Sequence, residues 1–147
     1  MKLSSRARYA IRAMMAIAKG TKDHRPINLA RVAKQTGISY RYLEQVSISL
    51  KNAGLLKAVS GKNGGHLLAR SAEKIKVGEI VEAAIGPINV VECVLDADSC
   101  MLVDACECRS LYCLINQGIR DAFNSFTLAD MAEHRVGKMI KKGKLPG

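Results

Sequence analysis

Two short amphipathic segments, 29–36 and 40–53, are separated by a tight turn at Gly37. In each segment the apolar residues recur every three or four positions, as on one face of a helix. Asn28 and Ser39 directly precede the segments and can cap the N-termini of the two helices. The pattern therefore predicts two short helices joined by a glycine turn, which is typical of a helix-turn-helix unit.

The neighbouring segments extend this unit to a winged helix. An apolar stripe over 4–19 predicts an earlier helix. Residues 55–60 and 66–69 are strand candidates, and the Asn-Gly type turn over 61–65 predicts a hairpin between them. A further helix is expected over 77–85, before Gly-Pro. A helix, a helix-turn-helix and a hairpin with a basic tip follow one another in the order of a winged-helix DNA-binding domain.

The charge distribution points to the same half of the chain. Residues 1–76 hold 16 of the 23 Lys and Arg residues and only three of the 13 acids. Residues 77–130 carry two basic side chains and nine acids. The N-terminal part is therefore expected to face a polyanion, although a solvated basic surface, RNA or membrane lipid would also fit the charge alone.

Base contacts are expected from the second of the two short helices, whose N-terminal residues enter the major groove in such units. Arg41 can bond guanine through two hydrogen bonds, Gln45 can do the same with adenine, and Glu44 can accept from cytosine. Ser39 suits a phosphate contact. Tyr42 suits the same role, or it is a partly buried helix residue.

The hairpin tip is the second candidate contact with DNA. Lys62 and Asn63 give a thin projection a cation and an amide, which suits a minor groove. Gly64 is included with them, although any hairpin needs glycines at its turn. The predicted DNA-contacting residues are Ser39, Arg41, Tyr42, Glu44, Gln45, Lys62, Asn63 and Gly64.

All five cysteines lie between Cys93 and Cys113. An odd number, with no sign of secretion, disfavours a disulfide framework. The first three, Cys93, Cys100 and Cys106, have the spacing C-x6-C-x5-C. Thiolates suit iron–sulfur clusters, zinc and copper(I), but the paired spacing of structural zinc sites is absent. A cluster, zinc and free redox-active thiols are the alternatives.

A long helix is predicted over 107–126, because apolar residues recur there at helical spacing. The apolar stripe on this helix is longer than one small domain can bury, so we expect the protein to dimerise through it. If the helix includes Cys106 and Cys113, the two lie about 10 Å apart along the axis, too far for one small cluster. Cys113 is interpreted as a core cysteine. Cys108 can be a ligand only if its stretch is a loop.

The expected fold is mainly α, a winged helix-turn-helix domain with a two-stranded wing and a long C-terminal dimerisation helix. Its expected parts are a DNA-binding domain (1–86), a cysteine-containing loop (87–106), and the long helix with a last helix over 128–140 and a basic tail (107–147). No apolar run is long enough for a membrane span, so a soluble cytoplasmic protein without a membrane partner is expected. The three histidines have no convincing acid–base partner, which disfavours an enzyme.

Together these features resemble the IscR- and NsrR-like branch of the Rrf2 family of bacterial transcription regulators. The resemblance rests on the opening MKLSSRARYA, on YLEQ at 42–45, on GGHLLA at 64–69 and on the cysteine loop. It implies a homodimer that binds palindromic operators. It also implies that Cys93, Cys100 and Cys106 ligate a [2Fe-2S] or [4Fe-4S] cluster. DNA affinity would then follow cluster supply, redox state or nitric oxide.

The cysteine loop departs from the family pattern, in which five residues separate the first two cysteines instead of six. IscR-like members take a fourth ligand from a histidine at the position of Arg109, and NsrR-like members take one from an acid at the position of Arg8. The fourth ligand is therefore open between Cys108, an acid such as Glu92 or Asp104, and a small molecule. A thiol-based or zinc-binding regulator on the same scaffold is the alternative function.

The wing departs from the family pattern as well. His66 stands where a tyrosine is common, and Ser60 stands where an arginine can read DNA. These two differences leave the target sequence open.

Overall fold

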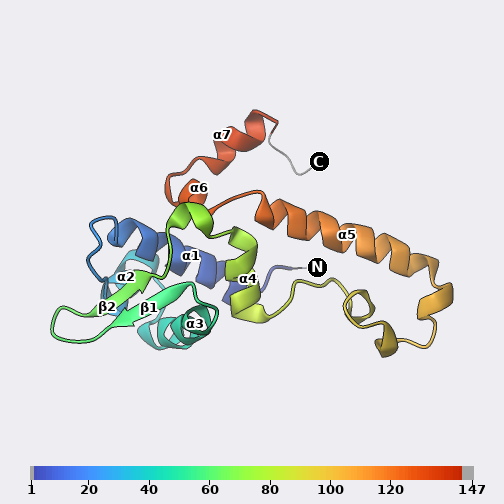
Figure 1. Ribbon diagram of the computed structural model, residues 1–147, viewed down its shortest axis with the longest axis horizontal. Coiled ribbons are helices and arrows are strands. Elements are labelled where there is room, and N and C mark those ends of the chain that lie inside the picture. The colour runs from blue at the N-terminus through green and yellow to red at the C-terminus, as the bar shows by residue number, and fades with distance from the viewer. Residues whose placement is uncertain (1, 144–147) are drawn as a thin grey trace.

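The computed structural model describes residues 2–143 and places them in a helical body from which one long helix extends (Figure 1). The chain follows the order α1 (Ser5–Gly20), α2 (Leu29–Thr36), α3 (Tyr40–Asn52), β1 (Leu56–Val59), β2 (Gly65–Leu68), α4 (Val77–Ile85), α5 (Glu107–Asn124), α6 (Leu128–Ala132) and α7 (Val136–Lys141). The mainly α winged helix-turn-helix expected from the sequence is confirmed.

Local capping explains the bounds of the helix-turn-helix. The Asn28 side chain accepts a hydrogen bond from the Arg31 amide at 2.9 Å, and Ser39 Oγ accepts one from the Tyr42 amide at 3.3 Å. Gly37 ends α2 in the left-handed conformation, with a φ of 71°, which costs glycine little. The two short helices therefore begin where the sequence predicts, with a turn of three residues between them.

The wing is a two-stranded antiparallel sheet in which Leu56 pairs with Leu68 and Val59 with Gly65. A backbone bridge joins this sheet to the segment before α2. The Ile27 amide donates to the His66 carbonyl at 3.0 Å, and the His66 amide donates to the Ile27 carbonyl at 2.8 Å. The wing is thus fixed through β2 to the segment that leads into the helix-turn-helix.

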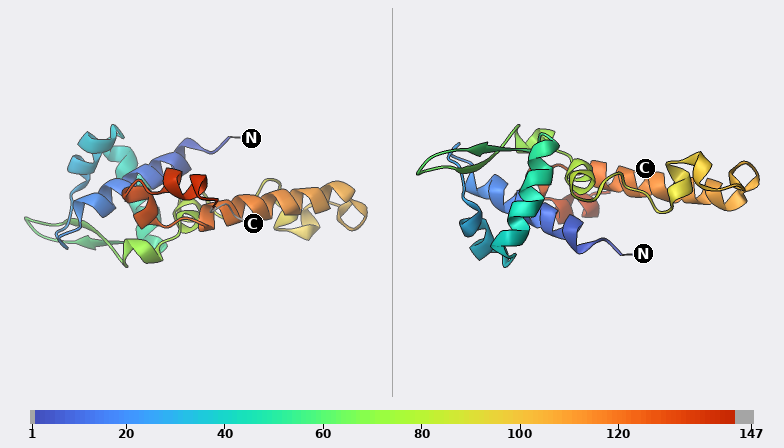
Figure 2. Two further views of the ribbon diagram at one scale, coloured as in Figure 1. Left: turned by 90° about the horizontal axis from the view of Figure 1, so that it is seen from above. Right: turned by 90° about the horizontal axis from the view of Figure 1, so that it is seen from below.

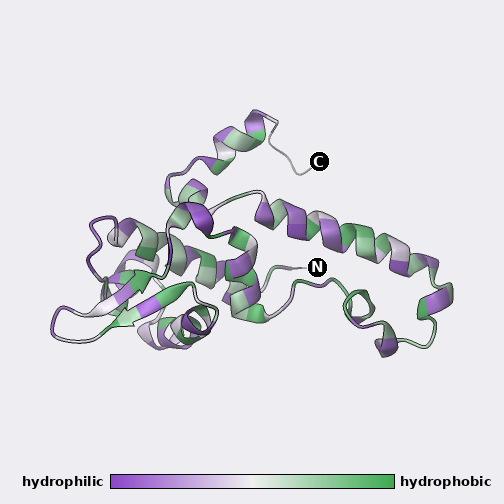
Figure 3. Ribbon diagram, in the orientation of Figure 1, coloured by the Kyte–Doolittle hydropathy of each residue, from purple (hydrophilic) through white to green (hydrophobic). Residues whose placement is uncertain are grey.

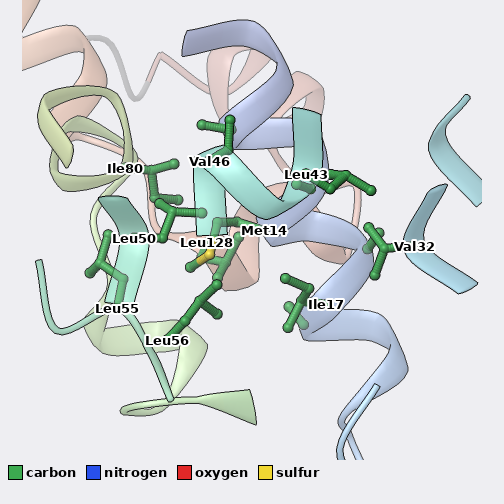
Figure 4. Close-up of a cluster of buried hydrophobic side chains, with 14 of the residues drawn as sticks. Met14, Ile17, Val32, Leu43, Val46, Leu50, Leu55, Leu56, Ile80 and Leu128 are labelled. Atoms are coloured by element: carbon green, nitrogen blue, oxygen red, sulfur yellow. The ribbon is translucent and has the colours of Figure 1, made fainter. Parts of the chain in front are cut away.

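The core lies around α1, which is covered by α2, α3, α4 and α6. Met14 and Ile17 of α1 are fully buried, and Figure 4 shows them among side chains of α3, the wing and α6. Each buried side chain of this size contributes about 1.5–3 kcal/mol to stability. The ten labelled core residues are Met14, Ile17, Val32, Leu43, Val46, Leu50, Leu55, Leu56, Ile80 and Leu128. This packing holds α3 in one orientation.

Helix α5 lies outside the body, and the segment between α4 and α5 runs outward beside it to the far end, where α5 begins (Figures 1 and 2). Apolar and polar residues alternate along this helix in the hydropathy colouring (Figure 3). Leu111, Leu114 and Ile115 are 54%, 71% and 40% exposed, so a single chain leaves much of the predicted stripe uncovered. Among the described residues of α5, only Asn116 is buried.

Three sequence expectations need correction. The single helix over 128–140 is wrong, because α6 ends at Ala132 and His134 adopts a left-handed φ of 55° before α7 begins. The cysteine loop is not wholly irregular, since it contains three short 3-10 turns. The long helix ends at Asn124 rather than 126. The expected tail over 141–147 lies outside the described residues from 144 onwards.

Candidate DNA-binding surface and cysteine segment

The N-terminal half of α3 presents the predicted base-reading side chains to solvent. Arg41, Glu44 and Gln45 are all exposed, and Ser39 occupies the N-cap just before them. The opposite face of the helix is anchored in the core through its buried leucine and valine residues. The helix is therefore rigidly seated with its donors and acceptors free, as direct readout of base edges requires.

Tyr42 has the second of its two predicted roles. It is half-buried, and its ring packs edge-to-face on Tyr9 of α1 with centroids 5.4 Å apart. The Arg12 guanidinium carbon lies 5.6 Å from the centroid of Tyr9. Tyr42 thus supports the packing of α1 on α3. Tyr40, which is 49% exposed, and Ile48, which is 52% exposed, extend the accessible face of the helix beyond the predicted set.

The wing tip carries Lys62 and Asn63 on its exposed side. Gly64 has a structural role, because its amide donates to the Gly61 carbonyl at 3.0 Å and a Cβ on it would lie 2.2 Å from the Val59 carbonyl oxygen. The tight turn therefore requires glycine at position 64. The loop projects beyond the body on the side of α3 (Figure 1).

The five thiols lie in the segment between α4 and α5 (86–106, here called the cysteine segment) and in the first half of α5. Cys93 is half-buried in a 3-10 turn, Cys100 is exposed, and Cys106 is half-buried at the N-cap of α5. Cys108 is exposed in the first turn of α5, so the loop that its ligand role requires is not formed there. Cys113 is half-buried and not part of the core. All five are free of disulfide bonds.

Two side chains of α5 hold the start of this segment. Arg109 Nε donates to the Cys93 carbonyl at 2.9 Å, and the buried Asn116 side chain accepts a hydrogen bond from the Val90 amide at 3.0 Å. They lie seven residues apart and therefore on nearly the same face of the helix. Arg109 stands at the position where IscR-like members have a histidine ligand. In this chain it joins the 3-10 turn that contains Cys93 to α5.

The cysteine segment has donor atoms that suit a metal or cluster, but their side chains do not surround one common point. Three thiolates are a donor set suited to iron–sulfur clusters. Within residues 2–143, however, no three His, Cys, Asp or Glu side chains come together as a metal site. A cluster would require Cys93, Cys100 and Cys106 to move together.

The match to known proteins decides the family. The model of the Rrf2 family, described as an iron-dependent transcriptional regulator, matches residues 3–134. This chain belongs to the Rrf2 family. In the described part of this Rrf2 chain, no helix combines the length and the apolar character needed to cross a bilayer.

Relatives of this Rrf2 chain carry two different names. It is 33% identical over 135 residues to IscR of Pectobacterium atrosepticum, with 92% of the chain and 81% of the relative covered. It is 32% identical over 138 residues to CymR of Bacillus subtilis, with 94% of both covered. Both are named as transcriptional regulators. This Rrf2 protein is therefore a transcription regulator and not an enzyme.

Solved structures of both CymR and IscR resemble this chain. A structure of CymR, described as the global cysteine regulator of B. subtilis, has a TM-score of 0.74 at 31% identity and covers 91% of this chain and 98% of its own. A structure of T. potens IscR has a TM-score of 0.71, also at 31% identity, and covers 92% of this chain and 88% of its own. The Rrf2 fold is thus shared equally with proteins of both names.

Proposed function

We propose that this chain is a cytoplasmic DNA-binding regulator whose affinity for its operator depends on an iron–sulfur cluster, [2Fe-2S] or [4Fe-4S], held by Cys93, Cys100 and Cys106. The observation that carries the proposal is the arrangement of three free thiols on one segment between α4 and α5. Thiolate ligands suit a cluster better than they suit a hard cation. Loss of the cluster, a change in its redox state, or nitric oxide would be the signal.

The cysteine segment is also placed to influence the DNA-binding surface. Its start is tied to α5 through Arg109, and its end is the N-cap of that helix at Cys106. It follows α4 directly, and the end of α4 contacts α1 and α3 through Arg6. A rearrangement that gathers the three thiols must therefore pull on elements that contact the DNA-binding domain.

A homodimer completes the proposed regulator. The exposed apolar stripe on α5 is suited to a second copy of the same helix, and two copies present two α3 helices to the half-sites of a palindromic operator. The spacing between those helices depends on how α5 sits against each body. This gives the cysteine segment a physical route to DNA affinity.

The proposal is tested by purifying the protein without oxygen and measuring its absorption spectrum, iron and acid-labile sulfide. We expect a brown protein with equal iron and sulfide, and loss of both when Cys93, Cys100 or Cys106 is changed to Ala. Cys113→Ala is the matched control and should keep the cluster. Cys108→Ala tests whether this thiol is the fourth ligand. Full cluster content in all three ligand variants would refute the assignment.

A thiol-based or zinc-binding regulator is the second candidate. An identity to CymR that nearly equals the identity to IscR favours this candidate, and the ungathered thiols of residues 2–143 favour its metal-free thiol form. Stoichiometric zinc without iron or sulfide would support the zinc form. Reversible loss of DNA binding on oxidation of the metal-free protein would support the thiol form.

A further inference from the structure

A groove of about 410 Å³ lies between α3 and the wing. From α3 it is lined by Tyr40, Glu44, Ile48 and Lys51, which follow one another at helical spacing. The wing contributes His66 and three glycines of the hairpin. Figures 1 and 2 show the hairpin beside α3, with its loop projecting past the helix.

The geometry of duplex DNA places a sugar–phosphate strand over this groove. The strand separates the major groove, which α3 is built to enter, from the adjacent minor groove, which suits the wing tip. When both elements are engaged, this strand has to pass between them. The residues that line the groove then face phosphates rather than base edges.

The end of the groove at Lys51 and His66 is suited to an anion. The two side chains are close enough for the charge of Lys51 to act on the imidazole, and Lys51 forms no ion pair within residues 2–143. The Nδ1 atom of His66 is shielded from solvent, so a phosphate in the groove would have to meet the other nitrogen of the ring. Glu44 lies seven residues earlier, about 10 Å along the helix, at the base-reading end.

We propose that Lys51 and His66 bind a backbone phosphate of DNA in the groove between α3 and the wing, so that these two elements enclose one strand. The proposal rests on the DNA-binding part of the proposed function and does not depend on the cluster. It joins Lys51 of α3 and His66 of the wing in one phosphate site.

Proton uptake should accompany this contact. Burial, and then the charge of Lys51, lowers the pKa of His66 below 6.5, so the free protein holds a neutral ring near pH 7. The other titratable side chains that line the groove are Tyr40, Glu44 and Lys51, all from α3; the lining residues from the wing and from positions 28–29 add none. A phosphate beside the ring raises its pKa. DNA affinity should therefore rise as the pH falls through the pKa of the ring in the complex.

The first test is the salt dependence of DNA binding by Lys51→Gln, measured by fluorescence anisotropy. The probes are a short duplex of mixed sequence and an operator selected from a random pool. We expect weaker binding to both and a slope of log affinity against log salt that falls by about 0.9, the value for one lost phosphate contact. Lys138→Gln on α7 removes the same charge away from the groove and should keep the slope.

An unchanged slope in Lys51→Gln, or a loss confined to one operator sequence, would overturn the phosphate site while leaving DNA binding intact. If the wild-type protein binds neither probe, the DNA-binding function fails, and the site fails with it. Lys51 is exposed, so its substitution should not disturb the fold.

The second test uses pH. From about pH 5.5 to 7.5, where histidine titrates, wild-type affinity for the mixed duplex should rise toward acid, and His66→Gln should lose much of that rise. Circular dichroism checks that the variant folds. Equal pH dependence in the two proteins would remove His66 from the site, and the salt measurement on Lys51→Gln is independent of this variant.

Discussion

Arg6 shows how a single side chain can join three helices. From α1, its Nε donates to the Ala84 carbonyl near the end of α4 at 2.6 Å, and its Nη2 donates to Ser49 Oγ of α3 at 2.9 Å. Its guanidinium group bonds within the protein, because these two acceptors lie beside α1.

Replacing Arg6 by Gln should lower the free energy of unfolding by about 1.5–3 kcal/mol, since hydrogen bonds from a charged donor are lost and their acceptors are only partly accessible to water. Urea unfolding measures this change. Arg8→Gln is the matched control, because within residues 2–143 the Arg8 side chain bonds only the neighbouring Ser5 hydroxyl on the surface, and it should change stability by less than about 0.5 kcal/mol. Equal effects of the two substitutions would contradict the bridging role.

Gly65 is a second residue whose identity the backbone dictates. Its φ is 154°, and a Cβ there would lie 2.4 Å from the Ile27 carbonyl oxygen and 2.6 Å from the carbonyl carbon. Neither atom can yield without breaking the bridge between Ile27 and His66. Glycine is therefore required at the start of β2, next to the turn of the wing.

Gly65→Ala should destabilise the fold by about 2 kcal/mol or more, because the added methyl group meets backbone rather than a flexible side chain. Thermal or urea unfolding provides the measurement. Gly137→Ala on α7 has open space around the same atom and should be neutral or stabilising by up to about 1 kcal/mol. A Gly65→Ala protein as stable as wild type would show that the wing can shift freely.

At the scale of an element, Glu79 fixes the start of α4. Its carboxylate accepts a hydrogen bond from the Lys76 amide at 2.8 Å and pairs with Arg70. Burial raises the pKa of this carboxyl group, but the hydrogen bonds from Arg70 and the Lys76 amide outweigh burial, so the pKa lies below the usual 4.5. A pKa lower in the folded than in the unfolded state means that the ionised form stabilises the fold.

Glu79→Gln should therefore cost about 1 kcal/mol at pH 7, the usual value of an N-terminal cap. The contribution is fully present above pH 4.5 and is lost as the pH falls through the folded-state pKa, so the difference between variant and wild type should shrink in acid. Urea unfolding at several pH values tests this. Glu73→Gln, in the preceding 3-10 turn, should leave stability nearly unchanged; a difference independent of pH would count against the charge-based explanation.

The helices were predictable wherever their boundaries are set by local chemistry. The bounds 29–36 and 77–85 follow from apolar spacing, capping and glycine stops, all of which are visible in sequence. The break between α6 and α7 was missed, because the left-handed conformation of His134 has no local signal of that kind. The 3-10 turns around the cysteines were also missed, since a single turn is too short to show a period.

At the scale of the whole molecule, the sequence predicted the exposure of the proposed base-reading residues better than their long-range contacts. Arg41 and Gln45 are exposed as expected, whereas Tyr42 packs on Tyr9, a long-range contact that spacing cannot reveal. The groove with His66 was missed for the same reason, because it forms only when the wing folds back beside α3. The arrangement of the cysteines likewise depends on how the segment lies against α5.

We expect the exposed apolar stripe on α5 to form the interface of the proposed dimer. Leu111, Leu114 and Ile115 are exposed on one side of the helix, and Gly118 lies on the same side with nothing near its Cα to prevent close approach. Burial of each large side chain is worth about 1.5–3 kcal/mol. A second copy of the chain would gain this free energy along the whole stripe.

Leu114→Glu should therefore weaken the proposed dimer by about 100-fold or more, because it removes one large apolar contact and places a charge in the interface. Sedimentation velocity over a range of concentrations measures the dissociation constant. Lys138→Gln on α7, away from the stripe, is the control and should leave the dimer intact. A Leu114→Glu dimer of unchanged affinity would show that this stripe is not the interface and that the two DNA-binding domains are joined in another way, whereas a wild-type protein that stays monomeric would refute the dimer itself.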